Sequence, residues 1–409
     1  MATICLIGIN YAPEPIGIGP YTQGWAEALV AAGHRVRVIC GEPYYPAWTK
    51  MADVGPPFVR NCENGVEVMR VPHYVPSNPT AAGRLMQQAG FAANVWRGLQ
   101  SAGGVGRPDA VVAIAPVLLS APVALRLALR SGALSWIHVH DFEADAAIAT
   151  GLLPLWAGRL GAALENNILG RFDRASSISP RMTERLAARR GDAATTVELR
   201  NWAEPCVGGA SADGNAMRNE LGLPPCTLAL YSGNLARKQG IDVIIEAARR
   251  MQTRGDLAFV VCGEGPSAGP VAAAASVLPN LHFRPLQPRE RLPDLLAMAD
   301  IHLLPQIGEA ADLVLPSKLA NMLASGRPVV ATADRGTSLA EEVDGCGLVV
   351  PPGDVGSFTL AIEALADSPA RCAELGNAAR RRATERWSKA SLLHRFIGSL
   401  EQALAEHRT

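Results

Sequence analysis

Short runs of apolar residues alternate with segments of helical periodicity along the whole chain. This alternation predicts strands buried on both faces and joined by helices, as in parallel α/β domains. In the first half, seven runs have this character: 4–7, 35–40, 66–71, 110–114, 135–139, 175–178 and 196–199. In the second half there are six: 227–231, 258–262, 281–283, 301–304, 328–332 and 347–350. The helices expected between them include 21–32, 182–189, 240–252 and 291–298.

The two halves repeat one plan, in which a strand leads through a glycine-bearing loop into a helix. We therefore predict an α/β protein of two Rossmann-like domains, whose parallel sheets face an interdomain cleft that holds the ligand. The expected domains are 1–204 and 205–388. The final helix, 389–409, is expected to pack back on the first domain, and the polar stretch 205–219 is the expected linker.

The amino-acid composition argues against several classes of protein. Thirty-eight basic residues balance thirty-eight acidic ones, so no positive excess points to nucleic acid. The eight cysteines are scattered without a Cys-x-x-Cys pair, which favours free thiols in a reducing compartment. The apolar run 110–125 is broken by two prolines, and the first residues do not form a signal peptide, so we expect a cytoplasmic protein.

The stretch 312–327 is the most informative part of the chain. A polar loop leads into a short helix, expected over 318–325, and then into a buried strand. Unpaired backbone N–H groups at the start of a helix favour an anion. Four polar residues stand beside them: Asp312, Ser317, Lys318 and Asn321. This arrangement favours a ligand that carries a diphosphate.

Two other loops of the second half could contact the same ligand. Arg237 and Lys238 follow the strand 227–231, and charge-assisted hydrogen bonds from such cations are worth roughly 1.5–3 kcal/mol each. Gly263 and Glu264 follow the next strand, where glycine permits close approach of a ligand. Glu264 then either meets a base or ribose or caps its own loop.

In the first half, His140 and Asp141 follow a predicted strand at the edge where α/β sites form. They could bind a hydroxyl group and accept its proton. We interpret His138, one strand period earlier, as a core histidine. Gly17 and Gly19 either admit a ligand or serve a turn, and their spacing does not match the dinucleotide fingerprint.

Taken together, these motifs resemble glycosyltransferase family 4, of GT-B fold, and within it the colanic-acid and related exopolysaccharide transferases. The resemblance extends over nearly the whole chain. Its main blocks are Gly8-Ile-Asn-Tyr-x-Pro-Glu14, Pro43-Tyr-Tyr-Pro46, His138-x-x-Asp141, Tyr231-Ser-Gly-Asn234, Lys238-Gln-Gly240 and Asp312-Leu-Val-Leu-Pro-Ser-Lys318.

The resemblance implies retaining transfer of a sugar from a nucleoside-diphosphate sugar, GDP- or UDP-linked, to a hydroxyl of a growing exopolysaccharide unit. It implies no metal or other cofactor, an acceptor on polyprenyl diphosphate, and contact with the inner membrane. The implied catalytic residues are His140, Asp141, Lys238 and Asp312. The implied donor contacts are Gly17, Gly19, Asn234, Arg237, Gly263, Glu264, Leu313, Val314, Leu315, Pro316, Ser317, Lys318 and Asn321.

The chain departs from the family pattern at several of these positions. The paired family glutamates would fall on Leu313 and Asn321, so Asp312 or Glu309 would have to supply a carboxylate. Asn234 and Gln239 stand where the family has arginine and lysine. A nucleotide-sugar epimerase of the same fold and a non-catalytic nucleotide-sugar-binding homologue therefore stay open as alternatives.

Two segments carry arginines among large apolar residues, namely 84–97 and 152–171. They are either membrane contacts or ordinary amphipathic helices that pack inward.

Overall fold

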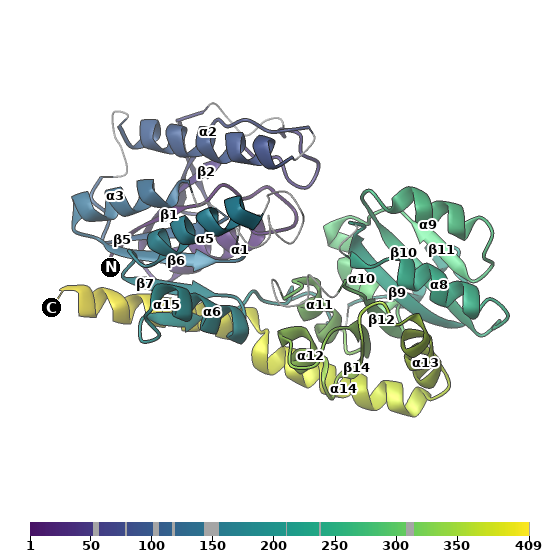
Figure 1. Cartoon of the computed structure of the whole chain (residues 1–409). Helices are drawn as coiled ribbons and strands as arrows, with labels where there is room; N and C mark the ends of the chain where they lie inside the picture. Colours follow the sequence, from purple (N-terminus) through teal and green to yellow (C-terminus); the bar gives the residue numbers. More distant parts are fainter. Residues whose placement is uncertain are drawn as a thin grey trace. The chain divides into compact units, whose positions relative to one another are not determined.

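The computed structural model describes residues 1–51, 57–77, 80–100, 106–116, 119–142, 155–209, 211–236, 239–307 and 315–408. The chain divides into two compact units, each an α/β assembly (Figure 1). The first comprises Met1–Arg200 and Ala390–Thr409, and the second comprises Asn201–Lys389. The stretch 205–219, which we expected to be a linker, instead lies within the second unit. From Gly214 on, this stretch forms helix α7 (Gly214–Glu220), which Asp213 caps by accepting a hydrogen bond from the Ala216 N–H.

The first unit is built on an eight-stranded sheet of order β3-β4-β2-β1-β5-β6-β7-β8. Its strands are β1 (Thr3–Ile7), β2 (Arg35–Gly41), β3 (Arg60–Glu63), β4 (Val66–Val71), β5 (Ala110–Ala115), β6 (Leu134–Val139), β7 (Arg174–Ser177) and β8 (Thr196–Glu198). The seven predicted strands are confirmed and pair in parallel. The eighth strand, β3, was not predicted, because its residues are polar; it pairs antiparallel to β4 at the edge of the sheet.

Helices cover both faces of this sheet. Crossovers between parallel strands are right-handed, so the direction in which the chain steps along the sheet decides which face the connecting helix covers. The step from β1 to β2 places helix α1 (Gly19–Ala31) on one face. The chain moves in the opposite direction through α2 (Ala81–Gln100), α3 (Ala121–Ser131), α5 (Leu155–Leu169) and α6 (Pro180–Arg190). These four helices therefore lie on the other face (Figure 1).

The last helix, α15 (Lys389–Arg408), contributes to the core of the first unit. Phe396 of α15 stacks on Trp25 of α1, with their ring centroids 4.3 Å apart. Trp25 in turn meets the edge of His138 of β6 at 4.3 Å. The rings of Trp25, His138 and Phe396 thus form one aromatic cluster, which joins helix α15 at the end of the chain to helix α1 near its beginning.

The second unit contains a six-stranded, wholly parallel sheet of order β11-β10-β9-β12-β13-β14. The strands are β9 (Thr227–Asn234), β10 (Leu257–Glu264), β11 (Leu281–Arg284), β12 (Ile301–Leu304), β13 (Val329–Thr332) and β14 (Gly347–Val350). All six were predicted. The helices are α8 (Asp242–Arg250), α9 (Ala268–Ala275), α10 (Leu292–Ala297), α11 (Lys318–Ala324), α12 (Ser338–Val343), α13 (Val355–Ala366) and α14 (Pro369–Arg386).

Successive residues of β9 enter different hydrophobic clusters. Ala229 and Tyr231 pack on one side of the sheet, and Leu228 and Leu230 pack on the other. Burial on both faces explains why this strand reads as a continuous apolar run.

No helix among the described residues has the length and apolar character needed to cross a bilayer. All eight cysteines are free, and burial raises the pKa of Cys5, Cys40 and Cys262 to about 12.

Candidate functional site

Two glycines bring the backbones of β9 and β10 together at the carboxyl edge of the second sheet. Gly233 and Gly263 are register partners, and a Cβ atom on Gly263 would lie 2.0 Å from the carbonyl oxygen of Gly233. Gly233 itself has a φ of 130°, which side chains rarely adopt. Both positions therefore need glycine, and the exposed residues Asn234 and Glu264 end the two strands side by side.

Lys318, the first residue of α11, is held at the same edge. Its Nζ donates to the Tyr231 hydroxyl at 2.8 Å and to Oε1 of Gln239 at 2.7 Å. The ammonium also lies 4.1 Å from the centre of the Tyr231 ring, a distance typical of a cation–π contact. The sequence indicated Lys318 as a ligand contact but gave no sign of these two hydrogen bonds.

Tyr231 links this cation to the end of its own strand. Its hydroxyl lies 2.6 Å from the carbonyl oxygen of Asn234, to which it donates a hydrogen bond. Burial raises the pKa of Tyr231, so the phenol stays neutral at physiological pH. Gln239 is neutral as well. Neither of these two groups carries a charge at physiological pH.

The other described residues of the 312–327 stretch serve different purposes. Leu315 and Pro316 are buried, and Ser317 is exposed and caps α11 with no side-chain hydrogen bond. Asn321 accepts a hydrogen bond from the Glu204 N–H through Oδ1, at 2.7 Å. Asn321 thus fixes the start of the second unit against α11, although the sequence indicated only a ligand contact.

Several predicted residues fall outside the described part of the chain: Arg237, Lys238, Glu309, Asp312, Leu313 and Val314. Their roles stay predictions.

A buried amide follows strand β12 in the second unit. Gln306 follows β12 and is 8% exposed; its backbone exchanges two hydrogen bonds with the Thr332 hydroxyl. Its Oε1 is buried and accepts no hydrogen bond from the described residues. Buried acceptors are normally satisfied, so Gln306 is a further candidate for a ligand contact.

In the first unit, the two histidines of β6 have different surroundings. His138 is fully buried, and its Nδ1 lies 2.8 Å from the Ser176 hydroxyl, which supports its interpretation as a core histidine. His140 follows β6 at the carboxyl edge, with its ring centroid 4.4 Å from that of His138. Burial lowers the pKa of His140 to about 3, so it is a neutral imidazole at pH 7. Asp141, the next residue, is half-buried.

The carboxylate of Glu14 binds the loops that follow β1 and β2 to each other, a role that the sequence did not indicate. Glu14 is 2% exposed, and its Oε1 accepts hydrogen bonds from the backbone N–H groups of Tyr44 and Tyr45, both at 3.1 Å. Its Oε2 accepts one from Asn10, at 2.9 Å. Burial raises the pKa of Glu14, and these three donors oppose that rise. The loop after β1 is thereby joined to the loop after β2.

The same network explains the two glycines of the first loop. A Cβ atom on Gly17 would lie 3.1 Å from the Tyr45 ring, and Gly17 has a φ of 80°. A Cβ atom on Gly19 would lie 3.3 Å from Oε2 of Glu14. The chain's own packing thus favours glycine at Gly17, and a side chain at Gly19 would crowd Glu14. Ligand contact by either glycine stays a prediction.

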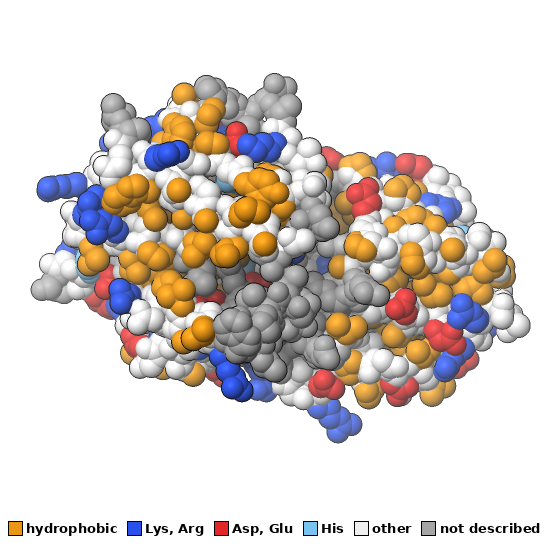
Figure 2. Space-filling view, turned by 45° about the horizontal axis from the view of Figure 1, so that its top comes forward, with side chains coloured by type: hydrophobic (Ala, Val, Ile, Leu, Met, Phe, Trp, Pro, Cys, Tyr) orange, Lys and Arg blue, Asp and Glu red, His pale blue; other side chains and the backbone are white. Residues whose placement is uncertain are grey.

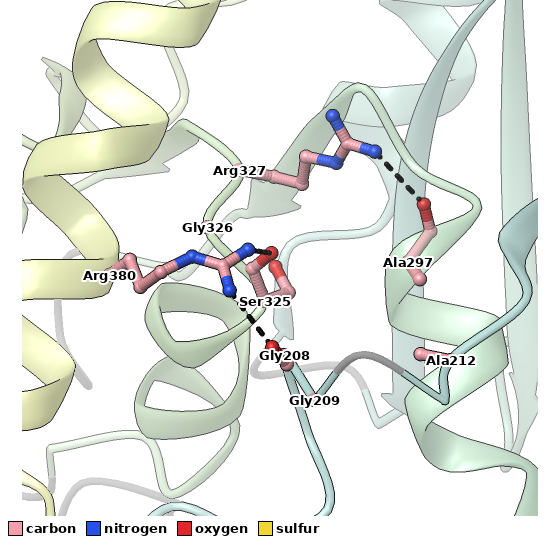
Figure 3. A pocket seen from close by; sticks show the side chains of 8 residues that line it. All are labelled: Gly208, Gly209, Ala212, Ala297, Ser325, Gly326, Arg327 and Arg380. Atoms are coloured by element: carbon pink, nitrogen blue, oxygen red, sulfur yellow. Dashed lines mark hydrogen bonds between the residues drawn. The ribbon is translucent and has the colours of Figure 1, made fainter.

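A pocket of about 230 Å³ in the second unit contains none of the predicted residues. It lies where α10 and α11 end (Figure 3), whereas Lys318 is the first residue of α11. Arg380 donates to the carbonyl oxygens of Gly208 and Ser325, and Arg327 donates to that of Ala297. These guanidinium groups satisfy backbone carbonyls, a structural role.

Comparison with known proteins assigns the class of protein. Residues 17–202 match the family model described as glycosyl transferase 4-like domain. Residues 227–368 match the model described as glycosyl transferases group 1. Both units are therefore matched by glycosyltransferase models.

A curated relative narrows the assignment. The chain is 36% identical to the putative colanic acid biosynthesis glycosyl transferase WcaI of Escherichia coli K12, over 97% of this chain and 99% of that protein. The chain belongs to glycosyltransferase family 4, is similar to WcaI, and is a hexosyltransferase-type enzyme.

Solved structures agree on the fold. Sucrose-phosphate synthase from Thermosynechococcus elongatus has a TM-score of 0.76 at 18% identity, covering 99% of this chain and 100% of that one. Anabaena Alr3699/HepE, solved in complex with UDP-glucose, has a TM-score of 0.70 at 14% identity, covering 98% of this chain and 100% of that one. With the two parallel α/β units, these similarities establish the GT-B fold.

Proposed function

We propose that this glycosyltransferase moves a hexosyl group from a UDP- or GDP-linked sugar to a hydroxyl of a growing, lipid-linked exopolysaccharide unit. Transfer proceeds with retention of configuration and needs no metal ion. The observation that carries the proposal is the fixed ammonium of Lys318, held at the carboxyl edge of a parallel sheet by two neutral groups. Ligands of α/β proteins bind at this edge.

On the donor side, Lys318 has the chemistry that a leaving diphosphate needs. Negative charge develops on the diphosphate as its bond to the sugar breaks, and a preorganised cation stabilises that charge without reorganisation. Mutagenesis of preorganised donors elsewhere gives roughly 3 kcal/mol for each one. Arg237 and Lys238 supply further positive charge in the proposal. Glu264 and Asn234 stand beside the same edge for contacts with the nucleoside.

On the acceptor side, His140 and Asp141 orient a sugar hydroxyl. Because its pKa lies near 3, the His140 ring is neutral and a weak base, so its role is hydrogen bonding rather than proton uptake. The acceptor hydroxyl gives its proton to the leaving phosphate, which departs from the face of the sugar that the hydroxyl attacks.

The exopolysaccharide acceptor in this proposal is supported by similarity to WcaI, whose name places that protein in colanic acid biosynthesis. A lipid-linked acceptor would bring the enzyme to the surface of a membrane.

A transfer assay tests the proposal. Purified protein is incubated in EDTA with UDP- or GDP-sugars and polyprenyl-diphosphate-linked saccharides, and the linkage formed is read by NMR. We expect release of the nucleoside diphosphate and a product that keeps the donor's anomeric configuration. An altered nucleotide-sugar without any acceptor product would instead assign an epimerase, and binding without turnover would assign a non-catalytic homologue.

A further inference from the structure

The backbone of Gln306 is held firmly at the carboxyl edge of the second sheet. Gln306 follows β12, which lies between β9 and β13 in the sheet. Its N–H donates to the hydroxyl of Thr332, the last residue of β13, at 2.7 Å, and that hydroxyl donates to the Gln306 carbonyl oxygen at 2.8 Å. Gly240, in the segment after β9, also lies against it, since an added Cβ atom would be 3.5 Å from the Gln306 carbonyl carbon. Segments from both neighbouring strands thus fix where the Gln306 side chain begins.

The side chain itself is buried without a partner for its oxygen. Gln306 is 8% exposed, and its Oε1 accepts no hydrogen bond within the part of the chain that the structure describes. The backbone groups of Gln306 are paired, so the unmet need belongs to the side-chain amide alone. A buried acceptor without a donor costs free energy, and buried polar groups in folded proteins are normally paired. The amide therefore indicates a ligand that supplies the missing group.

The cation of the proposed donor site lies at the same edge. Lys318 donates to Gln239 at 2.7 Å, and Gln239 directly precedes Gly240, which lies against Gln306. The sheet order is β10-β9-β12, so Glu264 at the end of β10 and Gln306 after β12 lie on opposite sides of β9. Glu264 is on the side proposed for the nucleoside. A diphosphate bound by the cation beside β9 then directs its sugar towards Gln306.

An uncharged amide suits a different part of the ligand from the part that a lysine suits. Ionised phosphate oxygens only accept hydrogen bonds, so the amide oxygen cannot bind them, whereas a sugar hydroxyl can pair with either end of the amide. Figure 2 shows acidic and basic side chains interspersed on the visible face of the second unit, so this face gives a donor no one-sided charge. Neutral sugars differ from one another in their hydroxyl groups rather than in charge. Neutral side chains must therefore distinguish them.

We propose that Gln306 helps to determine which sugar the enzyme transfers, by accepting a hydrogen bond from one hydroxyl of the donor's hexosyl group. The inference rests on the proposed function and names a residue that recognises the sugar. Gln306 takes no part in breaking the bond to the diphosphate. A site built to bind a hydroxyl rejects an analogue that lacks it, because the buried amide is then left unpaired. The fixed backbone favours recognition, since less freedom is lost when the hydroxyl binds.

Isothermal titration calorimetry of the full-length wild type and Gln306→Met tests the proposal, with UDP, GDP and their sugars as ligands. Methionine has nearly the shape of glutamine but forms no strong hydrogen bond. We expect unchanged affinity for the nucleoside diphosphate and about fivefold weaker binding of its sugar, the equivalent of one hydrogen bond. Gln252→Met, at an exposed glutamine of the same unit, is the matched control and should bind both ligands like the wild type.

Donors that each lack one sugar hydroxyl identify the group that Gln306 contacts. The wild type should bind one of these deoxy donors about fivefold more weakly than the complete donor. Gln306→Met should bind that deoxy donor and the complete donor equally, because the partner of the missing hydroxyl is already gone. In transfer assays the same deoxy donor should lose kcat/KM with the wild type and not with Gln306→Met.

Urea denaturation without ligand separates recognition from a structural role. Because Oε1 has no partner in the free protein, Gln306→Met should unfold at the wild-type urea concentration or a higher one. A lower midpoint with unchanged affinity for nucleotide-sugars would assign Gln306 a structural role and overturn the proposal. Equal losses of affinity for the nucleoside diphosphate and its sugar would also overturn it. The same holds if every deoxy donor is bound with the same relative affinity by Gln306→Met as by the wild type.

This proposal and the proposed function fail in different ways. If the wild type binds a nucleotide-sugar and Gln306→Met binds it equally well, the role of Gln306 is wrong and the transferase proposal stands. If the wild type binds no UDP- or GDP-sugar, both are overturned.

Discussion

Lys318 Nζ lies 2.8 Å from the Tyr231 hydroxyl, so a cation at the start of α11 is bound to a buried phenol of the adjacent strand β9. The residues are 87 positions apart in the chain. Because the phenol is neutral, the contact fixes the position of the cation without neutralising it. This contact supports the proposed donor site, and a substitution that removes the hydroxyl oxygen alone can test it.

Tyr231→Phe removes the hydroxyl and keeps the ring. Lys318 then loses one acceptor and the Asn234 carbonyl loses its donor, so the cation is held less firmly. One such hydrogen bond is worth about 1 kcal/mol, which corresponds to about fivefold weaker binding of UDP or GDP. Isothermal titration calorimetry measures the change. Tyr74→Phe, at a half-exposed tyrosine of the first unit, is the control; equal affinity in both variants would contradict the role of Tyr231.

Asn321→Ala separates a structural role from ligand binding. The Glu204 N–H loses its acceptor, and because this hydrogen bond is only partly buried we expect a cost of about 0.5–1.5 kcal/mol. Urea denaturation should show a loss of this size, while nucleotide affinity changes less than in Lys318→Gln. Asn321→Asp, which keeps an acceptor oxygen, is the companion variant and should lose less stability. A stable Asn321→Ala protein that no longer binds nucleotide would reverse the assignment.

Glu14→Ala should disconnect the loops that follow β1 and β2. Three donors, two from the backbone and one from Asn10, lose their common acceptor, and we expect a loss of about 3 kcal/mol in the free energy of unfolding. The exposed Glu385→Ala on α14 should change it by less than about 0.5 kcal/mol. Equal unfolding midpoints in urea for the two variants would show that the network contributes little.

The buried imidazole of His140 predicts a loss of stability in acid. Its folded-state pKa of about 3 lies below the ordinary value of 6.5, so between these values the unfolded chain binds a proton that the folded chain does not. The stabilisation is therefore complete above about pH 6.5 and decreases as the pH falls toward 3. Within this interval His140 contributes a slope of about 1.4 kcal/mol per pH unit.

His140→Gln should reduce that slope, measured by urea denaturation from pH 7.5 to pH 5. His394→Gln, at an exposed histidine of α15, should retain the wild-type slope. If the wild type and both variants show the same change of unfolding free energy with pH, the prediction that His140 is a buried neutral imidazole is wrong.

Most strands could be predicted from the sequence because the central ones are buried on both faces and read as apolar runs. Three predicted strands match the observed bounds without change, namely β4, β12 and β14. The missed strand, β3, has the polar sequence Arg60-Asn-Cys-Glu63, and its pairing with β4 is antiparallel at an edge. Nothing in its own hydrophobic pattern distinguishes it from a loop.

The candidate site could be predicted only in part. Lys318 was found because it begins a helix after a polar loop, whereas Tyr231 looked like one more apolar strand residue. Gln239 stands where the resemblance placed a lysine, and its contact with Lys318 depends on tertiary structure. Glu14 was part of a quoted motif, but its hydrogen bonds to residues 30 and 31 positions away have no local signature.

A thermal-shift panel tests the central claim most directly: the wild type and Lys318→Gln are melted with UDP, GDP and their sugars, with and without EDTA. Ligand at about 100 times its dissociation constant should stabilise the wild type by roughly 2.7 kcal/mol. We expect a shift with one of the two bases that survives EDTA. In Lys318→Gln the shift should be much smaller, because a charge-assisted contact worth about 1.5–3 kcal/mol is lost. No shift with any nucleotide, or one that EDTA abolishes, would contradict a metal-independent nucleotide-sugar site built around Lys318.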